Sequence, residues 1–235
     1  MILKVANLRK EFGNIVAMDN LDFALDDGEV HAIIGPNGAG KTTFFNLLTG
    51  TLPVDSGSVE FRGEPITNKT ISEIAQMGMV RKFQTPSVYE ELTIEEHFEI
   101  AVNPKKFADP DEQKRWAIEQ VNLEDRLAEK AKSLDHGNKQ WLEIGMILAT
   151  DPGLLLLDEP TAGMTIEETR RTAELIKRLN KSEGMSIITI EHDLDFVRNL
   201  EATVTVLHHG SRLAEGSIEE IEENVDVQRV YIGED

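Results

Sequence analysis

A glycine-rich stretch near the start of the chain constrains its fold more than any other: Gly35-Pro36-Asn37-Gly38-Ala39-Gly40-Lys41-Thr42-Thr43. It has the spacing G-x-x-x-x-G-K-[ST] and lies between an apolar run over residues 29–34 and a helical pattern over residues 44–48. Glycines let such a loop point several N–H groups at one anion, and the following helix adds the positive end of its dipole. Strand, loop and helix in this order predict a nucleoside triphosphate site rather than a chance glycine-rich turn.

Two side chains of this loop have expected roles in nucleotide binding. The Lys41 ammonium can reach the β- and γ-phosphates, and the Thr42 hydroxyl can ligate Mg²⁺. The whole stretch from Gly35 to Thr43 is therefore the expected binding loop for the nucleotide.

Composition excludes several other classes of protein. The chain has 235 residues, no cysteine and no apolar run approaching the roughly 20 residues of a membrane span. Disulfides and thiolate metal sites are thereby excluded, and we expect a soluble, cytoplasmic chain of one large domain or one domain with an insertion.

The charge balance is strongly acidic. Asp and Glu number 43 against 24 Lys and Arg, for a formal charge of −19, which argues against nucleic acid as a partner because phosphate contacts need a basic surface. Two explanations of the acidity remain open: a proteome adapted to high salt, or an ordinarily acidic protein.

The remaining pattern predicts an α/β fold with a parallel-sheet core. Residues 1–34 indicate an antiparallel β-ribbon, and residues 85–148 are helical with no clear strand, which indicates a helical insertion. We expect residues 1–84 and 149–235 to form the β-ribbon and the nucleotide-binding core. Capping boxes predict helix starts at four positions: Thr70, Thr93, Thr165 and Ser217.

Polar side chains follow the expected core strands. The four leucines of residues 154–157 lead into Asp158 and Glu159, and residues 187–190 lead into Glu191 and His192. Strand ends of a parallel sheet collect at the ligand crevice, so Asp158 is expected to hold Mg²⁺ and Glu159 to polarise the attacking water. The alternative is a pair of solvated acids at a strand end.

Three further side chains are candidates for the same site. His192 could contact the γ-phosphate and orient the attacking water, and Gln84, at the end of its own strand, suits a ligand of Mg²⁺ or of that water. Phe12, at the end of the ribbon, could stack on the nucleotide base or simply pack. The other histidines discussed are expected to be structural or surface residues: His31, His97, His208 and His209.

Together these motifs resemble the ATP-binding subunit of ABC transporters over essentially the whole chain. The phosphate loop, Gln84, Asp158-Glu159 and His192 occur in that family's order and approximate spacing. Between them lies the counterpart of the family's signature motif, Leu134-Asp135-His136-Gly137-Asn138. The resemblance implies that this motif caps the γ-phosphate bound by the opposite subunit of a head-to-tail dimer.

The resemblance also implies cofactors, partners and location. ATP and Mg²⁺ are bound, Phe12 stacks on the adenine, and residues Gln84 to Tyr89 receive a coupling helix from a membrane-embedded permease subunit. Further implied partners are a second, different ATPase subunit and, indirectly, an extracytoplasmic substrate-binding protein. The chain would work as a peripheral protein on the cytoplasmic face of the membrane and use ATP hydrolysis for import.

A finer resemblance is to the urea-uptake branch of the branched-chain amino-acid and amide uptake group. It is carried by residues 81–88, 136–137 and 139–146. The tail, from Leu213 to Gly216 and from Tyr231 to Glu234, is similar to the wider uptake group. Urea or a short amide is thus the expected cargo, with branched-chain amino acids as the alternative. A soluble ABC protein without a transporter is disfavoured because the chain has neither two cassettes nor a long coiled coil, and a small-molecule kinase is disfavoured by Glu159 and the signature stretch.

This chain departs from the family pattern within the signature. Asp135 stands where the family has Ser, His136 where it has the first Gly, and Asn138 where it has Gln. The histidine fits the urea branch, whereas the other two do not. The loop after Glu159 also lacks the aspartate of many relatives, which puts communication between the two ATP sites in doubt.

Overall fold

In the computed structural model of the chain, which describes residues 1–83 and 87–232, the strands form two sheets. The first is antiparallel, with its strands in the order β2-β1-β4-β5. The expected ribbon is confirmed, with the turn at Gly13-Asn14 joining its two long strands. The members of this sheet are β1 (Leu3–Phe12), β2 (Ile15–Leu25), β4 (Ser56–Phe61) and β5 (Glu64–Pro65).

The second sheet is the expected parallel core. Its order is β10-β9-β3-β8-β7-β6, and each neighbouring pair is parallel except β9 and β10, which form the hairpin through Gly210. Its members are β3 (Val30–Ile34), β6 (Met79–Lys82), β7 (Leu154–Asp158), β8 (Ser186–Ile190), β9 (Thr203–His208) and β10 (Ser211–Gly216).

Four of the helix starts agree with positions predicted from the sequence. All four expected capping boxes form, and they start α2, α3, α6 and α8. The helix over residues 225–232 was not predicted. The helices are α1 (Lys41–Leu48), α2 (Ile71–Gln76), α3 (Ile94–Ala101), α4 (Pro110–Gln120), α5 (His136–Leu148), α6 (Ile166–Glu183), α7 (Leu194–Leu200), α8 (Ile218–Glu223) and α9 (Val225–Ile232).

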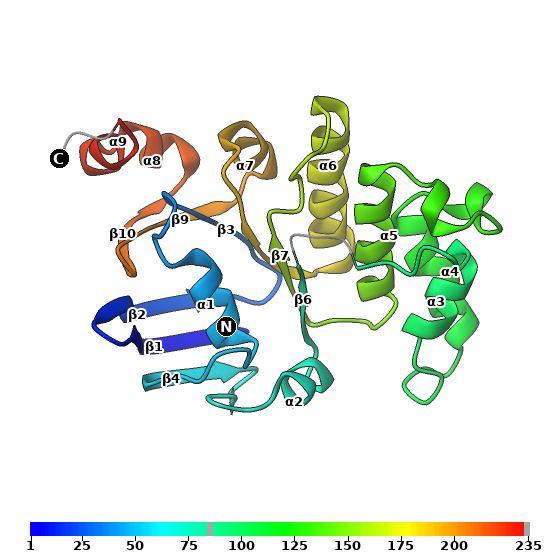
Figure 1. The fold of residues 1–235 in the computed structure, drawn as a ribbon, viewed down its shortest axis with the longest axis horizontal. Coiled ribbons are helices and arrows are strands. Elements are labelled where there is room, and N and C mark those ends of the chain that lie inside the picture. The colour runs from blue at the N-terminus through cyan, green and yellow to red at the C-terminus, as the bar shows by residue number, and fades with distance from the viewer. Residues whose placement is uncertain (84–86, 233–235) are drawn as a thin grey trace.

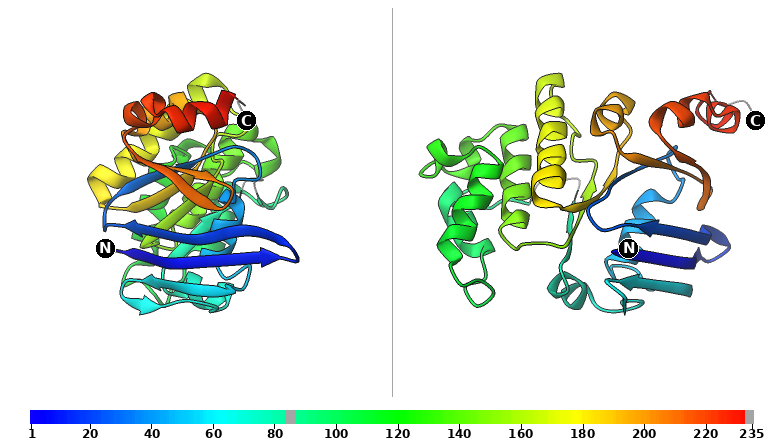
Figure 2. Two further views of the ribbon diagram at one scale, coloured as in Figure 1. Left: turned by 90° about the vertical axis from the view of Figure 1, so that its left-hand side faces the viewer. Right: turned by 180° about the vertical axis from the view of Figure 1, so that it is seen from behind.

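The parallel sheet is covered on both faces, as its continuous apolar strands require. Successive residues of β7 alternate between two cores: Leu154 and Leu156 pack with α1 and the antiparallel sheet, while Leu155 and Leu157 pack with the other helices. Figures 1 and 2 show α1 between the two sheets and α6 and α7 on the opposite side of the parallel sheet. Because β3 lies between β9 and β8, the phosphate loop leaves from the interior of the sheet rather than from an edge strand.

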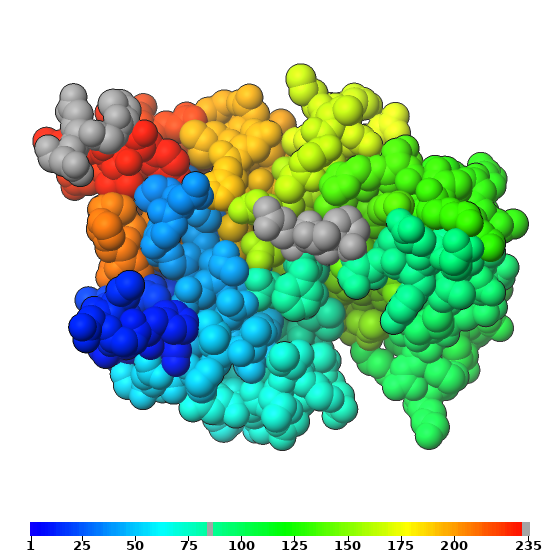
Figure 3. Space-filling model, viewed as in Figure 1, coloured from blue at the N-terminus to red at the C-terminus, as the bar shows by residue number. Residues whose placement is uncertain are grey.

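The helices of residues 87–148 form one side of the molecule, opposite the antiparallel strands (Figure 3). The division at residues 84 and 148 into core and helical subdomain remains a prediction. No helix within the described residues is both long and apolar enough to cross a membrane.

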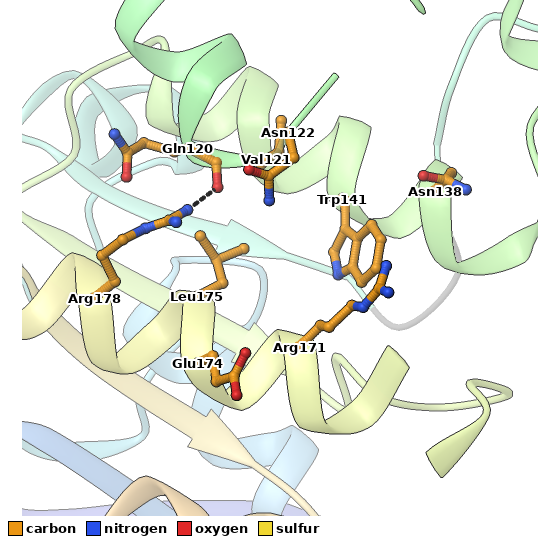
Figure 4. Close-up of a pocket in the computed structure, with 9 residues that line it drawn as sticks. All are labelled: Gln120, Val121, Asn122, Asn138, Trp141, Arg171, Glu174, Leu175 and Arg178. Atoms are coloured by element: carbon orange, nitrogen blue, oxygen red, sulfur yellow. Dashed lines mark hydrogen bonds between the residues drawn. The ribbon is translucent and has the colours of Figure 1, made fainter. Parts of the chain in front are cut away.

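A hollow of about 320 Å³ lies at the seam between these helices and α6 (Figure 4). Trp141 lines it on one side, and the guanidinium of Arg178 donates to the carbonyl of Gln120 across it. That carbonyl lies in the last turn of α4, where a cation stabilises the negative end of the helix dipole. This hydrogen bond from Arg178 therefore joins α6 to the C-terminal end of α4.

Candidate nucleotide and hydrolysis site

The phosphate loop is fixed by its own backbone and by its lysine. Gly35 has a φ of +149°, and a Cβ there would lie 2.2 Å from the Leu207 carbonyl oxygen, so only glycine fits. Lys41 turns back and its Nζ donates to the carbonyls of Gly35 at 2.6 Å and Pro36 at 3.1 Å. Burial lowers the pKa of Lys41, while the nearby carboxylates of Glu159 and Asp158 raise it.

Helix α1 differs from its neighbours at its first turn. It begins at Gly40 with no side-chain cap, whereas a side chain caps each helix from α2 to α8. The N–H groups of that turn and the positive end of its dipole are thus left to an external anion. A hollow of about 200 Å³ opens there, and Glu159 and His192 line it together with Ala17 and residues 37–43.

Glu159 and His192 come from neighbouring strand ends and contact each other. Glu159 follows β7, and its N–H donates to the carbonyl of Ile190 on β8 at 2.9 Å. Its Oε1 lies 2.9 Å from Nε2 of His192. A carboxylate beside an imidazole at a phosphate-binding loop can accept a proton from water while the imidazole holds the geometry.

Asp158 is buried and forms an ion pair with Arg81 of β6. The same guanidinium donates to Oδ1 of Asn46 on α1 at 2.6 Å and lies 4.7 Å from the ring centroid of Phe83. Sequence reasoning assigned no role to Arg81, because nothing in a linear pattern pairs residues 77 positions apart. Arg81 thus joins the Asp158 carboxylate to Asn46 of α1, and Asp158 itself does not line the hollow at the phosphate loop.

Glu191 is a second residue that sequence reasoning left without a role. It is 3% exposed, and its Oε1 accepts from both the N–H and the hydroxyl of Thr161, at 3.1 and 2.7 Å. Its Oε2 accepts from the N–H of His192 at 3.2 Å. Burial raises the pKa of Glu191, while the Thr161 donors lower it. The sequence signal that could have identified Glu191 was its position directly after a buried strand and next to His192.

Gln84 lies outside the described residues, but its flanks are held by a buried ion pair. Lys82 is fully buried, and its Nζ lies 3.4 Å from Oε2 of Glu143 on α5. Lys82 also donates to the Phe83 carbonyl at 3.0 Å, and Glu143 Oε1 accepts from the Ser87 N–H at 3.3 Å. Burial lowers the pKa of Lys82 and raises that of Glu143. This pair ties the end of β6 to the signature helix.

Phe12 ends β1 with its ring 46% exposed, and the Nζ of Lys10 lies 5.5 Å from the ring centroid. Ile15, which pairs with it across the turn, is also exposed. An exposed aromatic ring is available for stacking on a base, and its stacking role remains a prediction.

The signature stretch forms the first turn of α5 and is bonded within its own chain. Leu134 is buried, and Asp135 is the N-cap, accepting the Asn138 N–H at 2.8 Å. The Asn138 amide donates to both oxygens of the same carboxylate, at 2.9 and 2.8 Å. These bonds lower the pKa of Asp135, so it is ionised at neutral pH. The two departures from the family pattern, Asp135 and Asn138, therefore satisfy each other.

The remaining histidines have local partners. Nε2 of buried His31 lies 2.8 Å from the Thr205 hydroxyl, and buried His97 accepts the Tyr89 N–H at 2.9 Å. The rings of His208 and His209 contact each other at 4.0 Å between centroids. None of these four lines the hollow at the phosphate loop.

Comparison with known proteins gives a consistent result. A family model described as "ABC transporter" matches residues 18–162. The chain is 34% identical to the high-affinity branched-chain amino acid transport ATP-binding protein LivG of Salmonella typhimurium, covering 99% of this chain and 98% of that protein. It is 36% identical to the probable LivG of Methanocaldococcus jannaschii, with the same coverage. Among solved structures, the ADP conformation of an ATP-binding cassette of an ABC transporter superposes with a TM-score of 0.88 at 33% identity, covering 99% of both chains.

Proposed function

This chain belongs to the ABC transporter family and is an ATP-hydrolysing enzyme, and from that premise we propose that it energises a branched-chain amino-acid importer. The cargo is inferred from the relatives, which are named for branched-chain amino-acid transport. They favour the alternative of the sequence analysis over urea, for which they offer no support. The hydrolytic role rests on one observation above all, the Glu159–His192 contact at the hollow beside the phosphate loop.

In the proposed reaction, the backbone of residues 35–43 and Lys41 bind the ATP phosphates. Glu159 accepts the proton of the attacking water, while His192 holds that water and the carboxylate in line with the γ-phosphate. Glu191 keeps the backbone of both strand ends in place through Thr161 and His192.

Mg²⁺ fits the oxygen donors at this site. Thr42 lines the hollow, and the Asp158 carboxylate acts on Lys41 of the same loop, where it partly offsets the lowering of the lysine pKa by burial. Few protein ligands suffice for Mg²⁺, because it retains water and phosphate oxygens, and Gln84 is the third candidate by resemblance. When bound, the ion neutralises charge on the β- and γ-phosphates.

The proposed assembly is a head-to-tail dimer in which the signature turn of each ATPase subunit closes the ATP site of the other. We propose that the partner is a different ATPase subunit, that permease subunits dock at residues 84–89, and that a substrate-binding protein delivers cargo. The chain would then work at the cytoplasmic face of the membrane. The departures at Asp135 and Asn138 support the mixed dimer, because an atypical signature suits one of two unequal sites.

Reconstitution of the chain with the permease subunits, sibling ATPase and substrate-binding protein of its importer tests this proposal. Leucine, isoleucine or valine should stimulate ATP hydrolysis, whereas urea should not. The same assembly carrying Glu159→Gln should show no stimulation by any of them. Stimulation by urea alone would overturn the cargo, and full transport-coupled activity without the sibling subunit would overturn the mixed dimer.

A further inference from the structure

His136 stands at a position where the family resemblance places glycine, and it uses its side chain inside its own chain. Its Nε2 lies 2.9 Å from the carbonyl oxygen of Ala162, a distance at which the ring N–H donates to that oxygen. Ala162 belongs to the loop that follows Glu159. The next residue, Gly163, has a φ of +76°, and a Cβ there would approach Nε2 of His136 to 3.2 Å. The ring thus lies directly against this loop.

The contact continues along the first turns of α5 and α6. A Cβ on Gly137 would fall 2.2 Å from Oε1 of Glu168, so the Glu168 side chain of α6 packs against the first turn of α5 at residue 137. Further along α5, the indole N–H of Trp141 donates to the Thr172 hydroxyl on α6 at 3.0 Å. The two helices are held together by these contacts, and His136 extends the contact onto the loop.

The loop leads directly to the residues proposed for hydrolysis. The Ala162 N–H donates to the Glu159 carbonyl at 3.1 Å, which closes a turn between them. Thr161 is bonded to buried Glu191, whose other oxygen accepts the His192 N–H. A hydrogen bond to the Ala162 carbonyl therefore acts on a turn whose other end carries the Glu159 carboxylate.

We propose that His136 is a positioning residue for ATP hydrolysis: it ties the signature turn to residues 160–164 and thereby fixes the carboxylate of Glu159 in the same chain. This inference rests on the proposed role of Glu159. The signature turn then serves two sites, since it faces the partner's nucleotide and also steadies the hydrolytic carboxylate of its own subunit. It also gives this chain a link between the two sites, although the loop lacks the aspartate found in many relatives.

Substitution of His136 tests the proposal in the assembled ATPase pair. His136→Leu removes the donor, and kcat should fall about tenfold, the factor expected for one lost hydrogen bond. His136→Gln places an amide N–H near the position of Nε2 and should restore kcat to within about threefold of the wild-type value. KM for ATP should stay within about twofold in both variants, because neither touches the phosphate loop.

A second readout separates this role from direct contact with the partner's nucleotide. In the presence of ATP, the subunits of the double variant Glu159→Gln, His136→Leu should associate with each other as tightly as those of Glu159→Gln alone. Weaker association together with a raised KM would show that His136 acts on the partner's ATP, and would overturn the proposal. Wild-type kcat in His136→Leu would overturn it as well.

Gly163 offers an independent test from the loop side. Gly163→Ala pushes a methyl group toward the imidazole and should lower kcat, with little further loss when His136→Leu is added. Gly184→Ala is the matched control, since Gly184 has a similar φ of +65° but no atom within 4 Å of its Cβ position. Equal kcat for both alanine variants would contradict the proposal. Persistent hydrolysis in Glu159→Gln alone would instead contradict the proposed function on which it rests.

Discussion

The phosphate loop and the signature turn are both helix starts, yet they treat their polar groups in opposite ways. Helix α1 begins without a side-chain cap, and Lys41, Glu159 and His192 surround the hollow in front of it. Helix α5 begins with Asp135 as its cap, and the polar side chains of its first turn bond to each other or to the same chain. The first helix start is arranged for an external ligand, whereas the second already has internal partners.

This difference shows why one motif is easier to interpret than the other. In the phosphate loop the backbone binds the anion, so the glycine pattern is nearly sufficient to assign the function. In the signature turn the same short polar side chains can cap their own helix or bind a partner's phosphate. For Asp135 the capping role is observed, and its role toward a partner remains a prediction.

The largest expected effect concerns the buried ion pair that joins the end of β6 to α5, the helix that begins with the signature turn. Lys82→Met leaves the buried Glu143 carboxylate without its cation, and the free energy of unfolding should fall by about 3–5 kcal/mol. Lys82→Met combined with Glu143→Leu should recover most of this loss, because it removes both charges from the interior. Urea denaturation of the wild type, Lys82→Met and the double variant measures the free energy of unfolding of each. A Lys82→Met protein as stable as the wild type would show that the ion pair contributes nothing to stability.

The next effect separates the phosphate loop from the fold around it. Lys41→Ala removes the cation expected at the β- and γ-phosphates, and kcat/KM for ATP should fall by roughly 10²–10³-fold. Lys69→Ala is a control, because Lys69 lies outside the hollow beside the loop. ATPase assays and titration with a fluorescent ATP analogue measure hydrolysis and nucleotide binding for the Lys41→Ala and Lys69→Ala variants. An unchanged kcat/KM would place the nucleotide elsewhere.

The smallest effect concerns the charge in the signature turn. Asp135 is exposed, and at 4 Å in bulk water a carboxylate and a phosphate charge repel by about 1 kcal/mol, so ATP-driven association should be weaker at low salt and strengthen as salt rises. Asp135→Ser keeps an N-cap oxygen but removes the charge, and should raise low-salt ATPase activity by up to roughly fivefold and flatten its salt dependence. Asp135→Asn also removes the charge, and it should raise low-salt ATPase activity and flatten the salt dependence in the same way as Asp135→Ser.

Identical curves of ATPase activity against salt concentration for the wild type and Asp135→Ser would contradict this account of the signature turn. The carboxylate would then serve only as the cap of α5, as its bonds to Asn138 already allow.

Local signals in the sequence predicted most of the fold. Capping boxes, turn residues and apolar runs act within a few positions, and the helix starts at Thr70, Thr93, Thr165 and Ser217 are confirmed. The strand over residues 56–61 is a partial exception, since its main partner is the distant strand β1 and its neighbour β5 has only two residues. Helix α9 was missed.

Strand ends determine where some candidate side chains lie: Glu159 and His192 line the hollow at the phosphate loop, whereas Asp158 pairs with Arg81, and their roles in hydrolysis remain predictions. What could not be predicted are contacts between distant segments, such as Arg81 with Asp158 and Lys82 with Glu143. Such pairs depend on how strands and helices pack, and a single sequence holds no periodic signal for them. The cargo was also beyond reach, because no residue identified in this chain is proposed to contact it.

The central claim is that Glu159 activates water beside the phosphate loop, and Glu159→Gln tests it most directly. ATP hydrolysis should fall by about 10²–10⁴-fold, the scale for losing a general base, while ATP affinity stays unchanged. Sizing of the assembled ATPase subunits with Mg²⁺-ATP should then show a stable, ATP-bound dimer. Hydrolysis by Glu159→Gln at a rate near that of the wild type would contradict the claim.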